Sequence, residues 1–148
     1  MEFLEGSPEI EVPEVGRWTI DAAQGRTDAI DRALDALEAR FEFGDRDRFV
    51  ARLCLDEAIT NACEHGGVTA ERPVEVFLHA DPPQWVLRVR DRGEGYDPEA
   101  LEKSEPDPYD HRGRGLPILD GYSERMVVAD RGREVTVWVA VQAEEPTA

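Results

Sequence analysis

The sequence predicts an α/β fold with two layers, in which helices pack on one face of a mixed, mainly antiparallel sheet. Two observations favour this class. The first half of the chain carries two long segments with apolar residues at helical spacing, and the second half carries four short segments rich in valine. The 148 residues suffice for one core, and no repeat or low-complexity tract indicates a second domain.

Both ends of the chain are polar. Residues 1–16 contain Pro8, Pro13 and several glutamates, and we expect them to form a flexible leader. We expect residues 142–148 to form a frayed tail, which leaves residues 17–141 as the folded domain.

Two helices are predicted in the first half, after a short strand predicted over residues 17–20. The first covers residues 27–40 and begins with a Thr-Asp pair that can cap it. The second covers residues 45–65 and is ended by the glycines at 66–67. The apolar face of the first helix consists of Ile30, Ala33, Leu34 and Leu37.

Four strands are predicted in the second half, and the last has valine at every second position, as a half-buried strand does. Between the second and third strands we expect a polar, proline-rich stretch over residues 98–112 and then a short helix that begins near residue 113. The predicted strands are residues 74–80, 84–90, 126–130 and 135–141.

The charge balance excludes some partners. With 17 basic and 33 acidic side chains, the formal charge is −16, which repels nucleic-acid phosphates and anionic lipids. We therefore expect no direct binding to nucleic acid or to a membrane. Lys103 is the only lysine, so a cation for an anionic ligand has to come from arginine, a metal ion or backbone N–H groups.

The cysteines and the N-terminus indicate the compartment. Cys54 and Cys63 lie nine residues apart in one predicted helix, which gives neither a zinc spacing nor a disulfide framework. The N-terminus is acidic, unlike a signal peptide, and no apolar run approaches the roughly 18 residues of a membrane span. We therefore expect a cytoplasmic protein with buried, reduced thiols.

The second predicted helix carries a polar strip in an apolar setting. In "LDEAITNACEHGG", residues 55–67, Glu57, Asn61 and Glu64 continue one face, while apolar residues cover the other sides. Buried carboxylates are costly unless they are paired or bind a ligand, so the strip is expected to face a cavity. The alternative is the wet face of an amphipathic helix whose exposed side shifts along its length.

A glycine-containing segment, "RDRGEGYD", follows directly after a predicted strand. It places Asp91 at the strand end, with Gly93 and Gly95 behind it, where the backbone must turn sharply or approach a ligand closely. The carboxylate can accept a hydrogen bond from an exocyclic amine. A simple turn is the alternative, and a calcium loop is excluded because glycines occupy two ligand positions.

A second glycine segment, "HRGRGLPILDG", precedes the short helix. Gly113 and Gly115 free the backbone there, and Arg112 and Arg114 add positive charge, so the helix start is a candidate anion site. A glycine-rich helix start without a ligand is the common alternative.

Together, the acid-and-asparagine helix, the Asp-x-Gly-x-Gly segment and the Gly-x-Gly segment resemble the Bergerat ATP-binding fold of the GHKL superfamily. The likeness is greatest to the anti-sigma factor serine/threonine kinases of bacterial partner switching. The helix motif "DEAITNACEHG" is similar to their Glu-Ala-x-Thr-Asn-Ala-x-x-His pattern, and the shared pattern covers residues 17–141.

The resemblance implies a role for each matching residue. Asn61 would coordinate a Mg²⁺ ion that bridges the ATP phosphates, and Glu57 would be the general base toward a serine hydroxyl of the protein substrate. Asp91 would hold the adenine amino group. The residues implied to lie beside the base or in the lid around the phosphates are Gly93, Gly95, Gly113, Arg114 and Gly115.

The sequence also departs from the family pattern. The last strand usually opens with Gly-Thr, but here Arg133 follows Gly132, and Thr136 is the only hydroxyl nearby. Arg32 is the best-placed arginine to complete the site of a partner subunit. We expect His65, which adjoins the site, to be structural.

The predicted function is an ATP-dependent serine/threonine kinase that phosphorylates a STAS-type antagonist and sequesters a sigma factor. One alternative is a non-catalytic, nucleotide-gated module that binds a protein partner, which the change at Arg133 favours and Glu57 disfavours. A histidine-kinase-type ATPase domain is a third, weaker alternative. The resemblance also implies a homodimer.

Overall fold

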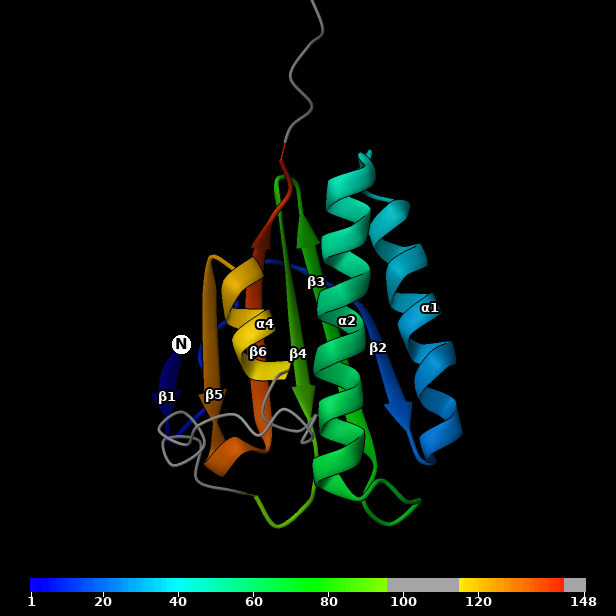
Figure 1. The fold of residues 1–148 in the computed structure, drawn as a ribbon, viewed down its shortest axis with the longest axis vertical. Helices are drawn as coiled ribbons and strands as arrows, with labels where there is room; N and C mark the ends of the chain where they lie inside the picture. Colours follow the sequence, from blue (N-terminus) through cyan, green and yellow to red (C-terminus); the bar gives the residue numbers. More distant parts are fainter. Residues whose placement is uncertain (96–114, 143–148) are drawn as a thin grey trace, which may run out of the picture.

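The computed structural model describes residues 1–95 and 115–142. Six strands of these residues form one sheet, and the helices cover one of its faces (Figure 1). The sheet order is β1-β5-β6-β4-β3-β2, and every neighbouring pair is antiparallel except β1 with β5. The predicted class is therefore confirmed. The strands are β1 (Glu2–Leu4), β2 (Glu14–Ile20), β3 (Val74–Asp81), β4 (Gln84–Arg90), β5 (Arg125–Ala129) and β6 (Glu134–Ala140).

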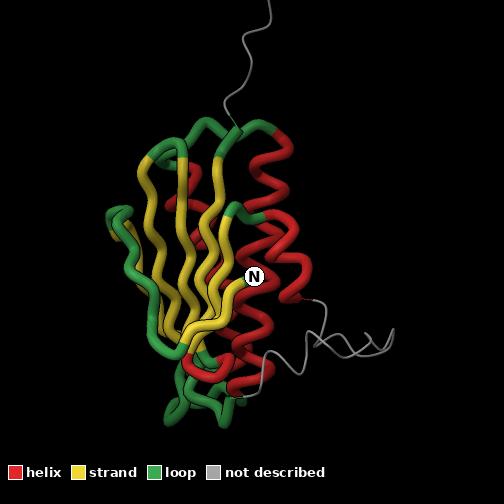
Figure 2. Tube along the Cα trace, turned by 90° about the vertical axis from the view of Figure 1, so that its left-hand side faces the viewer, coloured by secondary structure: helices red, strands yellow, loops and turns green. Residues whose placement is uncertain are grey.

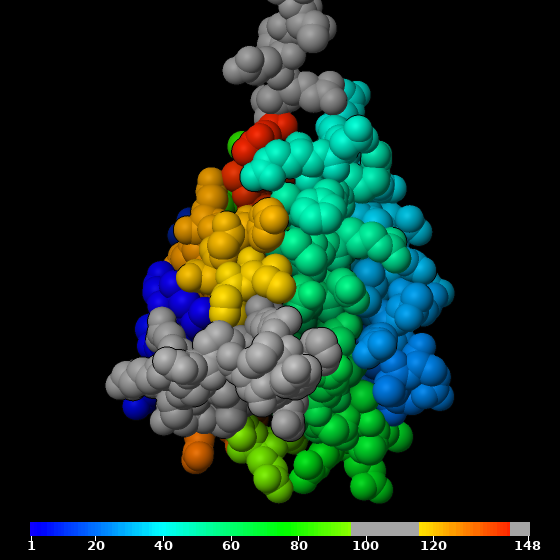
Figure 3. Space-filling view, viewed as in Figure 1, coloured from blue at the N-terminus to red at the C-terminus, as the bar shows by residue number. Residues whose placement is uncertain are grey.

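The helix layer contains α1, α2 and α4, of which α2 runs along most of this face beside α4 (Figure 3). The helix α2 ends where the sequence predicts, because Gly67 adopts the left-handed conformation with φ 55°. Pro117 lies in the first turn of α4. The bounds are α1 (Arg26–Glu38), α2 (Asp45–Gly66) and α4 (Gly115–Tyr122), with short 3-10 helices η1 (Ala23–Gly25) and η3 (Asp130–Gly132).

The inner face of the sheet packs against the helices in one continuous apolar core. Strand alternation selects its members, because successive side chains point to opposite faces. In β4, for example, Trp85, Leu87 and Val89 are inward and at most 1% exposed. The predicted apolar face of α1 is buried in the same core. Cys54 and Cys63 are also buried as expected, and burial raises the pKa of the Cys54 thiol to about 12.

The outer face has a different cover. The chain between β1 and β2 crosses behind the sheet (Figure 1) and lies along its outer side (Figure 2). We call residues 5–13 the strap. Ile10 and Val12 of the strap pack on a small cluster of Val86, Val127 and Trp138. Because of this cover β6 is buried on both faces, and not half-buried as predicted.

The prediction that residues 1–16 form a flexible leader is wrong, because parts of this segment belong to the sheet. Residues 2–4 pair with β5 as the edge strand β1, and β2 already begins at Glu14. The Val12 carbonyl contacts His79 Nδ1 at 2.7 Å, and the Pro13 carbonyl accepts the Ala80 N–H at 3.0 Å. These are long-range contacts, which local composition does not reveal.

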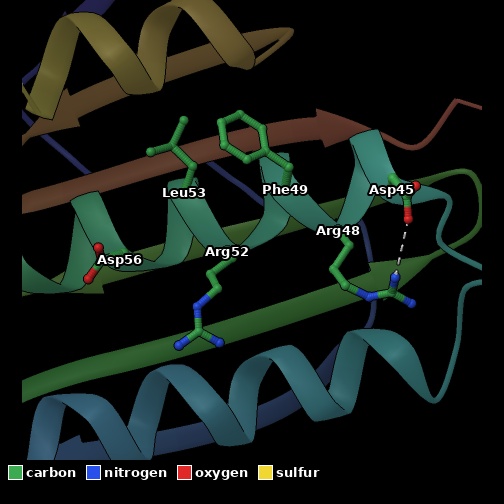
Figure 4. A pocket seen from close by; sticks show the side chains of 6 residues that line it. All are labelled: Asp45, Arg48, Phe49, Arg52, Leu53 and Asp56. Atoms are coloured by element: carbon green, nitrogen blue, oxygen red, sulfur yellow. Dashed lines mark ion pairs between the residues drawn. The ribbon is translucent and has the colours of Figure 1, made fainter.

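The first half of α2 is polar on the side that faces α1. Arg48 and Arg52 point toward α1, whereas Phe49 and Leu53 point to the other side (Figure 4). Arg48 Nε lies 2.8 Å from Glu38 Oε1 of α1. The side chains border a shallow groove of about 470 Å³. In the described part of the chain, no helix has the length and apolarity of a membrane span.

Candidate functional site

The site is built around Asp91, the residue directly after β4. Side chains alternate between the two faces along β4, and Asp91 continues the inward series of Trp85, Leu87 and Val89. The last position of this inward series is therefore a carboxylate. Asp91 is 5% exposed, and its N–H donates to the Arg133 carbonyl at 2.8 Å. The sequence prediction of an acidic residue at a strand end is therefore confirmed, and the residue is buried.

The carboxylate of Asp91 is held by its own loop. The Gly93 N–H donates to Oδ1 at 2.8 Å. Burial raises the pKa of Asp91, while the Gly93 bond and the charges of His65 and Arg133 act against that rise. A carboxylate has about four lone-pair positions, so the bond to Gly93 leaves acceptor capacity for a donor such as an exocyclic amine.

The end of α2 touches this loop. A Cβ at Gly66 would lie 2.6 Å from Cβ of Asp91, and a Cβ at Gly93 would lie 2.8 Å from Cα of Gly66. Cβ atoms in proteins essentially never approach other heavy atoms this closely, so glycine is required at both positions. The absence of a side chain at Gly93 therefore lets α2 approach; the predicted approach of a base to this backbone stays a prediction.

The polar strip of α2 divides by burial. Asn61 is 9% exposed, Glu57 is half-buried and Glu64 is exposed. Burial raises the pKa of Glu57, and the neighbouring charges of Asp56 and Glu64 add to the rise. The alternative of a wet face therefore fits Glu64 but not the buried Asn61, and a cavity in front of Asn61 and Glu57 stays a prediction.

Arg133 and Thr136, which lie close together in the sequence, make contacts in different places. Thr136 is buried on the outer face, where its hydroxyl accepts a hydrogen bond from Arg88 Nε at 3.0 Å. It therefore lies on the opposite side of the sheet from Asp91 and does not replace the missing hydroxyl. Arg133 Nε instead donates to the Gly93 carbonyl at 2.8 Å, beside Asp91.

Sequence reasoning missed two residues of this site, Gly66 and Arg133. A single glycine suffices to end a helix, so the second glycine of the pair at 66–67 was a signal of a close approach. For Arg133 the signal was the departure from Gly-Thr. Its guanidinium contacts a loop 39 or 40 positions away, which no local pattern encodes.

Other predicted site residues are not all described. Gly113 and Arg114 lie outside the described residues, and Gly115 is the first residue of α4. Arg32 is exposed and pairs with Asp28 one turn earlier, with Nε 2.8 Å from Oδ2.

The family resemblance implies that Asn61 helps to bind a Mg²⁺ ion, and this stays a prediction. Among residues 1–95 and 115–142, no three His, Cys, Asp or Glu side chains form a group that could hold a metal ion. Mg²⁺ commonly takes only one or two protein ligands and completes its octahedron with water and substrate phosphates. The amide oxygen of Asn61 has the hard donor character that this ion prefers.

Comparisons with known proteins agree with this geometry. Residues 20–139 match the family model of the histidine kinase-like ATPase domain, which belongs to the GHKL superfamily. A search of curated proteins gave no match. The matched range spans the core, the polar part of α2, Asp91 and Arg133. The family implies ATP binding, which suits a buried carboxylate acceptor and a buried asparagine on the helix that ends against it. The chain therefore belongs to the histidine kinase-like ATPase domain family.

Proposed function

We propose that this protein is an ATP-dependent serine/threonine protein kinase that also sequesters a sigma factor. The observation that carries the kinase part is the position of Glu57. It is half-buried on α2, one helical turn before the buried Asn61 and on the helix that ends against Asp91. Binding of a nucleotide alone does not require a carboxylate there, whereas transfer to a hydroxyl uses a base.

Phosphoryl transfer depends mainly on positioning and on stabilisation of charge. Asp91 would accept a hydrogen bond from the adenine amino group and orient the nucleotide. Asn61 would help to hold Mg²⁺, which supplies positive charge at the phosphates when it is bound. Glu57 would then accept the proton of the attacking hydroxyl. Because burial raises the pKa of Glu57, its carboxylate is a stronger base than an ordinary glutamate.

The partners follow from the resemblance and from charge. We propose a STAS-type antagonist as the phosphorylation substrate, and a sigma factor as the sequestered partner. The charge of −16 suits a basic, DNA-facing region of such a factor. Unchanged sigma binding after neutralisation of surface carboxylates would exclude this electrostatic part.

We also propose a homodimer, which sedimentation at two protein concentrations would test.

A second candidate is a nucleotide-gated module that binds its partner without phosphoryl transfer. Arg133, in place of the hydroxyl residue of the family pattern, is the observation that favours it.

The first test is calorimetric titration of ATP with Mg²⁺. We expect the wild type to bind, and Asp91→Asn and Asn61→Ala to lose about a hundredfold or more in affinity, because each removes a buried polar contact to the ligand. Asp81→Asn, at the exposed end of β3, is the matched control. Absence of binding by the wild type would contradict the proposal.

The second test separates the kinase from the binding module. Wild type, Glu57→Gln and the control Asp45→Asn are incubated with radiolabelled ATP and STAS-domain proteins of the same genome. We expect Glu57→Gln to bind ATP normally and to transfer phosphate at least about a hundredfold more slowly, as expected for loss of a general base. Asp45 is exposed in the first turn of the same helix, far from Glu57, so its variant is expected to keep activity. Equal rates for Glu57→Gln and wild type would contradict the role of Glu57.

A further inference from the structure

Arg133 connects three backbone positions of the Asp91 segment. Its carbonyl accepts the Asp91 N–H at 2.8 Å. Its side chain donates from Nε to the Gly93 carbonyl and from Nη2 to the Glu94 carbonyl, both at 2.8 Å. A single residue thus holds the chain from position 91 to position 94.

The guanidinium is itself fixed by η3. Nη1 lies 3.3 Å from both the carbonyl oxygen and Oδ1 of Asp130. The turn has an unusual shape, with φ of 50° at Asp130, 56° at Arg131 and 82° at Gly132. A Cβ at Gly95 would lie 2.8 Å from the Arg131 carbonyl oxygen, so the turn and the loop are in close contact. The lower end of the molecule in Figure 1 brings together the ends of α2 and β4 and this turn.

The loop needs such support. Gly93 and Gly95 give it wide backbone freedom, and Gly95 adopts φ 77°. A flexible loop that is ordered only when ligand binds lowers affinity, because the ordering entropy is lost at that moment. A loop that is already held in place avoids this loss.

We propose that Arg133 is a positioning residue that pre-forms the nucleotide-base subsite by holding residues 93 and 94 against η3 and thereby fixing Asp91. The inference rests on the proposed ATP binding and adds to it the residue that organises the base end. Arginine suits this role because its planar fork can donate to two carbonyls at once, whereas lysine presents a point charge and threonine a short hydroxyl.

The charge of Arg133 gives the role a second signature. The groups that face Asp91 are Cys63 and His65 of α2, Asp130 of η3, the Gly93 N–H and Arg133 itself. Burial raises the pKa of Asp91, and the positive charge of Arg133 opposes that rise. Without this charge, the carboxylate would take up a proton at a higher pH.

The test compares ATP affinity in wild type, Arg133→Lys and Arg133→Met between pH 5 and pH 8. Arg125→Met is the matched control, since Arg125 also makes a two-bond contact, to Glu2, at the opposite end of the sheet. At pH 8 we expect losses of about tenfold to a hundredfold for Arg133→Met and about threefold to tenfold for Arg133→Lys. The affinity of Arg125→Met should equal that of wild type.

The pH profile distinguishes positioning from a general structural defect. In wild type, affinity falls as the pH drops and Asp91 takes up a proton. In Arg133→Met this fall should begin at a higher pH, whereas Arg133→Lys keeps the charge and should retain the wild-type profile. The ratio of ATP to ADP affinity should stay constant, since the change lies at the base end. Wild-type affinity and profile in Arg133→Met would overturn the proposal.

Hydrogen exchange without nucleotide tests the loop independently. We expect the Gly93 amide to exchange about tenfold or more faster in Arg133→Met than in wild type, with thermal unfolding confirming that both are folded. Unchanged exchange in both Arg133 variants would overturn the positioning role. The wild type could bind no ATP while the Gly93 amide still exchanges faster in Arg133→Met than in wild type. In that case the proposed nucleotide binding fails, and the positioning of the loop by Arg133 stands.

Discussion

The two faces of the sheet are built by different means. The inner face is a continuous apolar layer under the helices. The outer face has a small apolar cluster under the strap, and arginine side chains lie over two of its aromatic rings. Arg17 and Arg90 lie over the Phe77 ring, with Cζ 4.7 and 5.6 Å from its centroid, and Arg125 lies over Trp138 at 4.6 Å.

This difference shows where the molecule places its charges. On the outer face, Glu134 is 1% exposed but is paired, with Oε1 2.6 Å from Arg90 Nη2 and 2.9 Å from Ser7 Oγ. On the inner face, the buried acid is Asp91, which lies at the end of the apolar layer and at the centre of the candidate site. The outer carboxylate holds structure together through its ion pairs, whereas we propose that the inner one receives a ligand.

The largest expected effect is on the outer face, at Glu134. Replacement by alanine leaves Arg88 and Arg90 without their buried partner, and we expect a loss of about 3 kcal/mol in the free energy of unfolding. Chemical denaturation measures it. Glu75→Ala, which removes a half-buried acid 3.6 Å from Arg92 on the same face, should cost less than about 0.5 kcal/mol. Equal losses would remove the distinction between the two acids.

A matched pair of valines compares the packing of the two faces. Val137 is inward and Val86 is outward, and both are fully buried. We expect Val137→Ala to cost about 2–3 kcal/mol and Val86→Ala about 1 kcal/mol, since the thin outer cover can collapse into the space. The same denaturant series measures both. A larger loss for Val86→Ala would show that the strap packs as tightly as the helices.

The strap itself offers a smaller effect. Ile10→Ala removes part of the apolar cover over Val86, and we expect a loss of about 1 kcal/mol. The double variant with Val86→Ala should lose less than the sum of the two single variants, because the two side chains share one contact. Strict additivity would mean that the strap contact contributes little.

The smallest effect, and one of opposite sign, is expected at Asp91. Because burial raises its pKa, the folded protein binds a proton more readily than the unfolded chain between the two pKa values. The ionised carboxylate therefore lowers stability at neutral pH, and this cost disappears as the pH falls through the folded-state pKa. Asp91→Asn should be as stable as wild type or up to about 1 kcal/mol more stable at pH 7, and the difference should vanish in acid.

Thermal unfolding between pH 4 and pH 8 measures this trend. Asp81→Asn, at an exposed position, is the control and should follow wild type throughout. A stability of Asp91→Asn that is lower than wild type at pH 7 would show that the carboxylate serves the fold and is not held at a cost for a ligand.

The sequence by itself determined the class of the fold and pointed to the central residues of the candidate site. Hydrophobic spacing of 3.6 and 2 residues located α1, α2 and the four strands of the second half, because these periods follow from local backbone geometry. Asp91 and Asn61 were also recognisable, since polar residues interrupt an apolar pattern at both places.

Only the tertiary structure decided the outer face and the support of the site. The pairing of β1 with β5 joins segments more than 120 positions apart, and the Arg133 contacts span 39 and 40 positions. Neither leaves a local periodicity, since composition near a terminus or a single arginine after a turn has the same appearance in many folds. The choice was made by long-range hydrogen bonding and burial, which exist only once the sheet has formed.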